Sequence, residues 1–241
     1  MRPFVRRPAV SPLRAACGGA AVLSALCSGP GCGARGGHLT APTPIGVSPI
    51  APTEAPPPPD AGLPPVDAGP GRPMKLTMYF VAEQPCPDGM DAALPKCGGG
   101  TLAAVSTGFR KTAAMQGSAR LCDGRVVSVR TVHPLCFAVV EGAPWGKTAS
   151  GRPARPFRSI AVDPAELTLG HWYFIPELRG LVLPAPSTGE VHDGCVRADD
   201  VGGGVKGAHI DLFVGRRDAM AALADLHAHG VTVADGATIC P

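Results

Sequence analysis

The sequence predicts a mainly β protein, a small barrel of short strands with one helix near the C-terminus. Three patterns support this fold class. Apolar and polar residues alternate over 76–81 and again over 210–214, which is the period of half-buried strands. Turn residues break the rest of the chain into short segments, as in other small barrels. A single helical pattern begins at Asp218 and ends at Gly230.

Residues 1–39 predict an export segment. Arginines precede a small, apolar stretch at 15–26, which is the order found in signal sequences. This stretch is too short and too often interrupted by glycine to form a convincing membrane span. Cys27 and Cys32 follow it as candidates for lipidation, although neither has the usual lipoprotein surroundings. We expect a protein of the periplasm, the outer membrane or the cell surface, either lipid-anchored or plainly secreted.

Residues 40–73 predict a disordered, proline-rich linker. The segment 41–73 holds twelve prolines, four of them consecutive at 56–59, and it cannot build an apolar core. Fully extended, it could reach on the order of 100 Å at ~3.1 Å per residue. A stiff tether of this kind suits a globular head held away from a membrane.

Residues 74–241 predict one globular domain that is long enough to bury a sizeable core. Residues 84–100 are rich in proline and glycine and predict a loop. Strands are predicted at 76–81, 125–132, 171–175, 195–198, 210–214 and 231–233. The net charge is only +3, so nucleic acid is not an expected partner, and we expect a monomer.

Six cysteines fall in this domain, an even number that predicts disulfides in an oxidising compartment. No Cys-x-x-Cys or His-x-x-x-His pair supports the alternative of a metal site, so we expect no metal and no cofactor. Many pairings are possible. Nearness along the chain favours Cys86–Cys97, Cys122–Cys136 and Cys195–Cys240.

The most distinctive stretch is 199–211, where two acidic positions flank a glycine-rich turn. Asp200 is expected to close one strand, and Asp211 to lie within the next. The turn includes Gly202 and Gly203, which allow the backbone to approach a ligand or another strand closely. Spacing alone fits equally well a glycine-rich hairpin with solvated acids.

Further motifs precede this stretch in a fixed order. The segment 147–215 contains Thr148-Ala149-Ser150-Gly151, Ala161-Val162-Asp163-Pro164, Leu169-Gly170 and Asp199-Asp200-Val201-Gly202-Gly203-Gly204-Val205-Lys206-Gly207-Ala208-His209-Ile210-Asp211. Together they resemble the 3D domain, a family named for three aspartates, which also forms the catalytic barrel of membrane-bound lytic transglycosylase A. Thr168 stands where that family usually has proline.

The resemblance implies a six-stranded double-psi β-barrel that cleaves peptidoglycan. Lytic transglycosylases cut the β-1,4 bond between MurNAc and GlcNAc without water, because the C6 hydroxyl of MurNAc attacks C1 and leaves a 1,6-anhydroMurNAc end. One carboxyl group donates a proton to the leaving oxygen and then accepts one from the C6 hydroxyl. This group must be protonated at the working pH, so burial or a neighbouring carboxylate has to raise its pKa.

The motifs place the family's catalytic aspartate at Asp211, with Asp200 and Asp163 as the other two signature acids. Asp211 is favoured as the proton donor over the alternative, Asp200, which is otherwise expected to tune the pKa of Asp211. Asp163 precedes a proline, so capping of a turn is an equal alternative. The glycan strand is expected to contact Gly202, Gly203, Lys206 and His209, for which a solvated turn lysine and an ordinary surface histidine are alternatives.

One departure from the family leaves the function open. The transglycosylase has a second domain that walls its substrate groove, and the insertion at 84–146 is expected to replace it only in part. Two alternatives therefore stand beside the lytic enzyme: a non-catalytic, expansin-like module that binds cell-wall glycan, and a true glycoside hydrolase. The aromatic residues that a sugar could stack on are Trp145, Trp172 and Tyr173, of which at least one is expected in the core.

Overall fold

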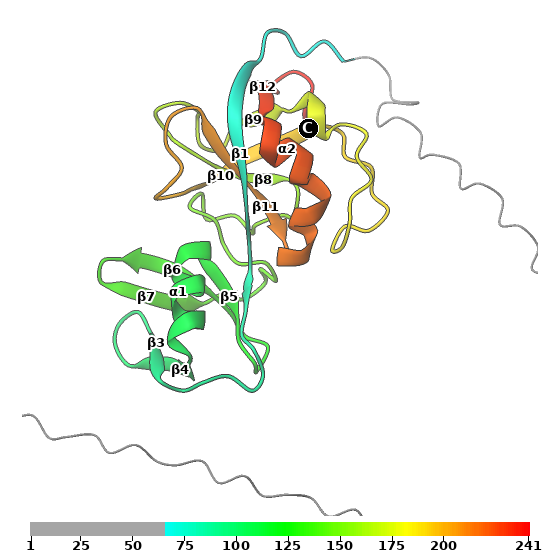
Figure 1. The fold of residues 1–241 in the computed structure, drawn as a ribbon. Coiled ribbons are helices and arrows are strands. Elements are labelled where there is room, and N and C mark those ends of the chain that lie inside the picture. The colour runs from blue at the N-terminus through cyan, green and yellow to red at the C-terminus, as the bar shows by residue number, and fades with distance from the viewer. Residues whose placement is uncertain (1–65) are drawn as a thin grey trace, which may run out of the picture. The chain divides into compact units, whose positions relative to one another are not determined.

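The computed structural model describes residues 66–241, which form a closed barrel with a smaller lobe inserted into it (Figure 1). The expected export segment at 1–39 and most of the expected linker at 40–73 lie outside the described residues. The first strand begins at Arg72, slightly before the expected start of the globular domain.

Six strands close the barrel in the order β1-β11-β8-β10-β9-β12. Their bounds are β1 Arg72–Phe80, β8 Ser159–Val162, β9 Trp172–Phe174, β10 Cys195–Val201, β11 His209–Gly215 and β12 Val231–Asp235. β1 is parallel to β11 and β8 is parallel to β10, whereas the other neighbours are antiparallel. The expected six-stranded barrel is confirmed. Strand β8, which ends at Val162 within the Ala161-Val162-Asp163-Pro164 motif, was not predicted as a strand.

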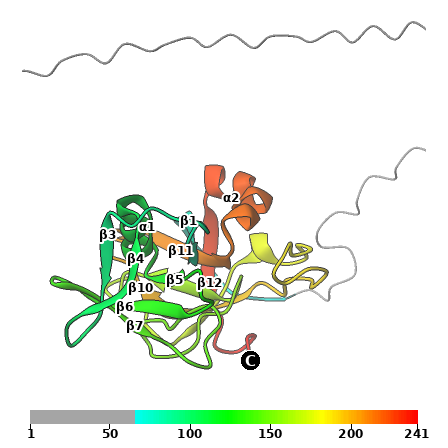
Figure 2. The same cartoon turned by 90° about the horizontal axis from the view of Figure 1, so that it is seen from below.

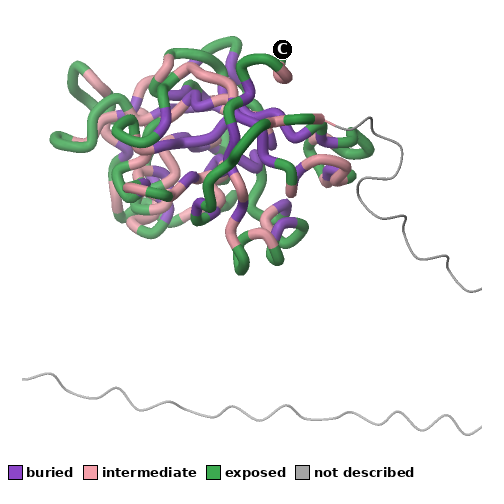
Figure 3. The backbone as a smooth tube through the Cα atoms, turned by 90° about the horizontal axis from the view of Figure 1, so that it is seen from above, coloured by how far each residue is buried: buried purple, intermediate pink, exposed green. Residues whose placement is uncertain are grey.

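Aliphatic side chains fill the barrel, as the low aromatic content of 5% requires. Leu76, Ile160, Ile210 and Leu212 are completely buried and belong to one continuous core. Figure 3 shows the buried backbone gathered inside and the exposed backbone in the outer loops. Each fully buried aliphatic side chain contributes about 1.5–3 kcal/mol, so this core is the main source of the barrel's stability.

The helical segment expected after Asp218 is confirmed, although its first part is a 3₁₀ helix. It consists of η2 (Arg217–Leu223) and α2 (Ala224–His229), and its apolar side packs on the barrel core. Gly230 ends it with a φ of 77°, a left-handed value that glycine adopts readily. A shorter 3₁₀ helix, η1 (Pro176–Leu178), follows β9.

The smaller lobe lies between β1 and β8 in the chain and has a core of its own, which includes Leu94, Phe109 and Phe137. Its elements are β2 Ala82–Glu83, β3 Ala92–Pro95, β4 Thr101–Val105, α1 Thr107–Gln116, β5 Ser118–Arg120, β6 Val126–Val132 and β7 Leu135–Val139. The Ser106 hydroxyl caps α1 by accepting a hydrogen bond from Phe109 N at 3.0 Å. Figures 1 and 2 show α1 in this lobe and α2 beside the barrel.

The small lobe corrects two expectations. Residues 92–95 of the expected loop form β3, which pairs with β4, and the insertion at 84–146 contains a helix, α1, that was not predicted. The physical reason is its composition. Much of its core consists of alanines such as Ala82, Ala113 and Ala119, so the apolar periodicity that signals a helix or a strand is weak.

Three disulfides join the cysteines of the described residues: Cys86–Cys122, Cys97–Cys136 and Cys195–Cys240. The last confirms the expected pair. The other two expected pairs were wrong, because strand pairing rather than nearness along the chain decides which sulfurs meet. β2 pairs parallel with β5, which places Cys86 beside Cys122, and a bridge between Lys96 and Phe137 places Cys97 beside Cys136.

Within residues 66–241, no helix is both long enough and apolar enough to cross a membrane.

Candidate active site

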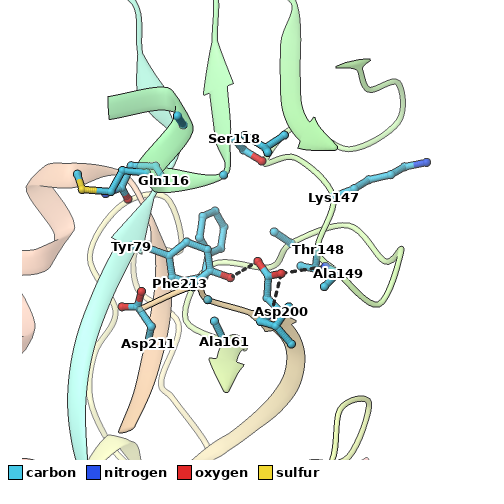
Figure 4. Close-up of a pocket in the computed structure, with 18 of the residues that line it drawn as sticks. Tyr79, Gln116, Ser118, Lys147, Thr148, Ala149, Ala161, Asp200, Asp211 and Phe213 are labelled. Carbon is cyan, nitrogen blue, oxygen red and sulfur yellow. Dashed lines mark hydrogen bonds between the residues drawn. The ribbon is translucent and has the colours of Figure 1, made fainter. Parts of the chain in front are cut away.

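A cleft of about 470 Å³ opens between the barrel and the small lobe (Figure 4). From the barrel it is lined by Asp200, Asp211 and the glycine turn, and from the small lobe by the end of α1 and parts of β5 and β6. The structure therefore brings together the two acids that flank the glycine turn, and it adds a second wall that sequence patterns did not reveal.

Strand β10 has a β-bulge directly before Asp200, which lines the cleft. Ala198 and Asp200 pair with consecutive residues of β8, so Asp199 is the extra residue between them. Asp199 is buried, and its carboxylate accepts hydrogen bonds from Ser159 Oγ at 2.9 Å and from the Arg197 guanidinium at 2.7 Å. The two adjacent acids thus differ in place: Asp199 holds strands together, and Asp200 lines the cleft.

The Asp200 carboxylate accepts three hydrogen bonds. The backbone N–H groups of Ala149 and Val201 donate to its Oδ1 at 2.9 Å, and the Tyr79 hydroxyl donates to its Oδ2 at 3.2 Å. Burial raises the pKa of Asp200, while these donors favour the ionised form and oppose the shift. An acid with three donors around it is well prepared to carry negative charge.

Asp211 has a different environment. Among the described residues, one hydrogen-bond donor reaches its carboxyl group: Thr77 Oγ1 donates to Oδ1 at 2.8 Å. The parallel register of β1 and β11 sets Thr77 opposite Asp211. Burial raises the pKa of Asp211, and the nearby charge of Asp200 raises it further. Of the two acids, Asp211 is therefore the one better suited to hold a proton.

Tyr79 and Thr77 are site residues that sequence reasoning missed. Burial, followed by the charges of Asp200 and Asp211, holds the pKa of Tyr79 well above its usual value, so its phenol keeps the proton that it donates to Asp200. The alternation in the first strand already places Thr77 and Tyr79 on the same face, opposite to Leu76. No local pattern indicates that this face lies beside the strand that carries Asp211.

Asp163 is not part of the cleft lining. Its carboxylate accepts hydrogen bonds from the backbone N–H groups of Ala165 at 3.1 Å and Gly207 at 2.9 Å. These bonds, the one from Gly207 first, lower the pKa of Asp163, and the charge of Lys206 adds to the effect. This third signature acid caps its own turn and ties it to the glycine turn.

The expected substrate contacts divide into two groups. Gly202 and Gly203 line the cleft, and a side chain at Gly202 would come within 2.5 Å of Val205 Cγ2. Lys206 and His209 are outside the lining. His209 Nε2 lies 2.8 Å from Thr77 Oγ1, the atom that donates to Asp211, so His209 reaches the acid only through Thr77.

The aromatic candidates also divide. Trp145 lines the cleft and meets Phe213 edge-on with 6.5 Å between ring centroids, whereas Tyr173 lies in the barrel core and Trp172 outside the lining. In residues 66–241, no group of three or more His, Cys, Asp or Glu side chains could hold a metal ion.

The described residues thus form a closed barrel that presents a pair of half-buried carboxyl groups in an open cleft. Residues 158–234 match the family model of the 3D domain, and the match includes all three signature acids, Asp163, Asp200 and Asp211. Residues 158–234 of the chain therefore form a 3D domain.

Solved structures give further similarities. E. coli MltA with bound chitohexaose has 14% identity and a TM-score of 0.45, with 68% of this chain and 71% of that chain covered. A membrane-bound lytic murein transglycosylase from Agrobacterium tumefaciens has 16% identity and a TM-score of 0.40, with 70% of each chain covered. The lytic transglycosylase LtgG of Burkholderia pseudomallei has 21% identity and a TM-score of 0.32, with 65% and 63% covered. A comparison with curated proteins found no match.

Proposed function

We propose that this protein is a lytic transglycosylase that cleaves the β-1,4 bond between MurNAc and GlcNAc in peptidoglycan and leaves 1,6-anhydroMurNAc ends. The observation that carries the proposal is the unequal pair of acids in one cleft. Asp211 is half-buried with a single donor, while Asp200 is half-buried with three. The substrate class comes from the resemblance to the 3D domain, which the family match supports.

In the proposed reaction Asp211 acts twice. It first gives its proton to the glycosidic oxygen as the bond from that oxygen to C1 breaks. Its carboxylate then takes the proton of the C6 hydroxyl as the bond from O6 to C1 forms, so the acid is regenerated and no water is consumed. Asp200 remains ionised, raises the pKa of Asp211 and stabilises the positive charge that builds on the sugar ring.

The proposal includes export from the cytoplasm. The disulfides of the described residues suit an oxidising compartment such as the periplasm or the cell surface. We propose that residues 1–39 direct export, with Cys27 or Cys32 as the site of an optional lipid, and that residues 40–73 serve as the tether. The protein then acts as a monomer and contacts the membrane only through its N-terminal segment or its lipid.

The test is digestion of purified sacculi by the full chain, with the products separated by chromatography and identified by mass spectrometry. The wild type is expected to release anhydro-muropeptides. Asp211→Asn keeps the shape of the side chain but cannot donate and recover an acid proton, so we expect a loss of about 10²-fold or more. Asp200→Asn should keep partial activity with a shifted pH optimum.

The matched control is Asp225→Asn, which changes an exposed acid outside the cleft and should cut at the wild-type rate. Circular dichroism shows whether each variant is folded. A folded Asp211→Asn variant that still releases anhydro-muropeptides at the wild-type rate would remove Asp211 from its role. Products with only reducing ends would make the protein a hydrolase, and the absence of any product would make it a glycan-binding module.

A further inference from the structure

We propose that the cleft binds its glycan through carboxylate groups on the muramic acid residues, and that Arg130 and Lys147 bind those carboxylates. This inference rests on the proposed function and specifies which part of the peptidoglycan strand the site selects.

The charges of the cleft are divided between its two walls. Asp200 and Asp211 come from the barrel, whereas Arg130 comes from β6 and Lys147 from the connection after β7. Both acids are half-buried and both cations are exposed. Among the described residues, neither cation has a side-chain hydrogen bond or an ion pair. The charged groups that an entering ligand meets first are therefore positive.

Lys147 is fixed at its base. Its backbone N–H donates to Ser128 Oγ at 3.1 Å, and Ser128 is buried and bonded to Ser118 Oγ at 2.8 Å. The preceding residue, Gly146, packs so closely on this pair that a Cβ would come within 2.1 Å of Ser118 Oγ. Figure 4 shows the Lys147 side chain extending from this wall away from both aspartates. It is placed to meet a ligand rather than to neutralise the acids.

Arg130 is positioned by an irregularity of β6. Val129 and Thr131 pair with consecutive residues of β7, so Arg130 is the extra residue of a bulge, a device that re-aims a side chain. The second of those partners is Cys136, which is bridged to Cys97. The strand beside the bulge is therefore covalently held to the rest of the small lobe, which limits the movement of the wall that carries the cation.

Apolar side chains complete the surface. Met115 and Val132 of the small lobe and Val201 of the barrel line the cleft while remaining 76%, 58% and 42% exposed. Such groups suit the apolar faces of sugar rings. Sugar faces combined with carboxylates describe a muramic acid strand. Its carboxylate belongs to the stem peptide where one is attached, and to the lactyl group where the peptide is absent. A neutral glycan offers only the sugar faces.

Binding is measured with full-length Asp211→Asn protein, so that the strands stay intact. Native sacculi are compared with sacculi whose carboxylates have been converted to neutral amides. We expect this conversion to weaken binding about three- to tenfold at low ionic strength, the range expected for two exposed ion pairs. High salt should remove most of the difference. Equal binding to native and neutralised sacculi would overturn the inference.

Paired variants assign the effect to the cleft. Arg130→Gln with Lys147→Gln should weaken binding to native sacculi as much as amide conversion does, and should change nothing further on neutralised sacculi. The control, Lys111→Gln with Arg217→Gln, removes two exposed charges outside the cleft lining and should bind like the parent. Equal losses of binding in both double variants would show only non-specific electrostatic attraction and would contradict the inference. Unchanged binding by the Arg130→Gln/Lys147→Gln variant would also refute it.

A third substrate identifies the source of the carboxylate. Hydrolysis of the amide bond that joins each stem peptide to its lactyl group removes the peptide and frees the lactyl carboxylate. Binding to these stripped strands would show that the site accepts the lactyl carboxylate, and loss of binding would assign the carboxylates of the peptide. Failure of the proposed function has a separate signature, because binding does not require cleavage. A wild type that releases no fragments but binds in a charge-dependent way refutes cleavage only. If the wild type cuts and the Arg130→Gln/Lys147→Gln variant still binds normally, only the carboxylate site is refuted.

Discussion

Lowering the pH should decrease the free energy of unfolding of this protein through one buried histidine, His192. Its side chain is fully buried, with Nε2 2.6 Å from the Phe157 carbonyl oxygen and Nδ1 accepting the backbone N–H of Gly194 at 2.8 Å. This arrangement requires a neutral ring with its proton on Nε2. A second proton on Nδ1 would point at the Gly194 N–H. Burial lowers the pKa of His192 from 6.5 to about 4.

The sign follows from proton binding. Between about pH 6.5 and pH 4 the unfolded chain binds a proton at His192 and the folded protein does not, so the free energy of unfolding falls as the pH falls. The contribution is complete above pH 6.5, decreases steadily as the pH falls from 6.5 to about 4, and is absent below about pH 4. At ~1.4 kcal/mol per pKa unit, the shift corresponds to about 3 kcal/mol. Asp200 and Asp211, whose pKa values are raised, act in the opposite direction in the acid range.

The assay is guanidinium unfolding followed by circular dichroism, with the disulfides intact, at several pH values from neutral to about pH 4.5. His192→Gln can still donate to the Phe157 carbonyl but cannot take up a proton, so its stability should vary less over this range than that of the wild type. His133→Gln changes an exposed histidine and should follow the wild type. The same pH dependence in His192→Gln and the wild type would refute the reasoning.

Three further predictions concern the acids and the small lobe. Tyr79→Phe removes a donor that lowers the pKa of Asp200, so the acid limb of the pH profile of muropeptide release should move to higher pH; an unchanged profile would contradict this. Asp163→Asn weakens a tie to the glycine turn and should lower the thermal midpoint while leaving the pH optimum in place. Loss of all activity without a change in melting would instead indicate a chemical role for Asp163. Replacing both Cys97 and Cys136 by alanine should lower the free energy of unfolding by about 2–4 kcal/mol in denaturant titrations, and equal stability would count against a structural role for this bridge.

The positions of Asp200 and Asp211 could be predicted from the sequence. The glycine-dense turn between Asp200 and Asp211 is a local pattern, so it predicts two strands and brings their acids near each other. The expectation that these acids cleave a glycan came from the resemblance to the 3D domain. The match of residues 158–234 to the family model supports that resemblance. Other local patterns predicted β1, β6, β9 and the C-terminal helical segment, because each pattern depends only on residues that are close together in the sequence.

The sequence by itself thus determined the barrel class, the position of the acidic turn and the Cys195–Cys240 bridge. Only the tertiary structure decided what surrounds the acids. Thr77 and Tyr79 reach them because β1 lies parallel to β11, a pairing between segments more than a hundred residues apart. The small lobe, whose alanine-rich core gives a weak pattern, supplies the second wall of the cleft. Periodicity reports which face of a segment is buried, but the partner of that face is chosen by the packing of the whole domain.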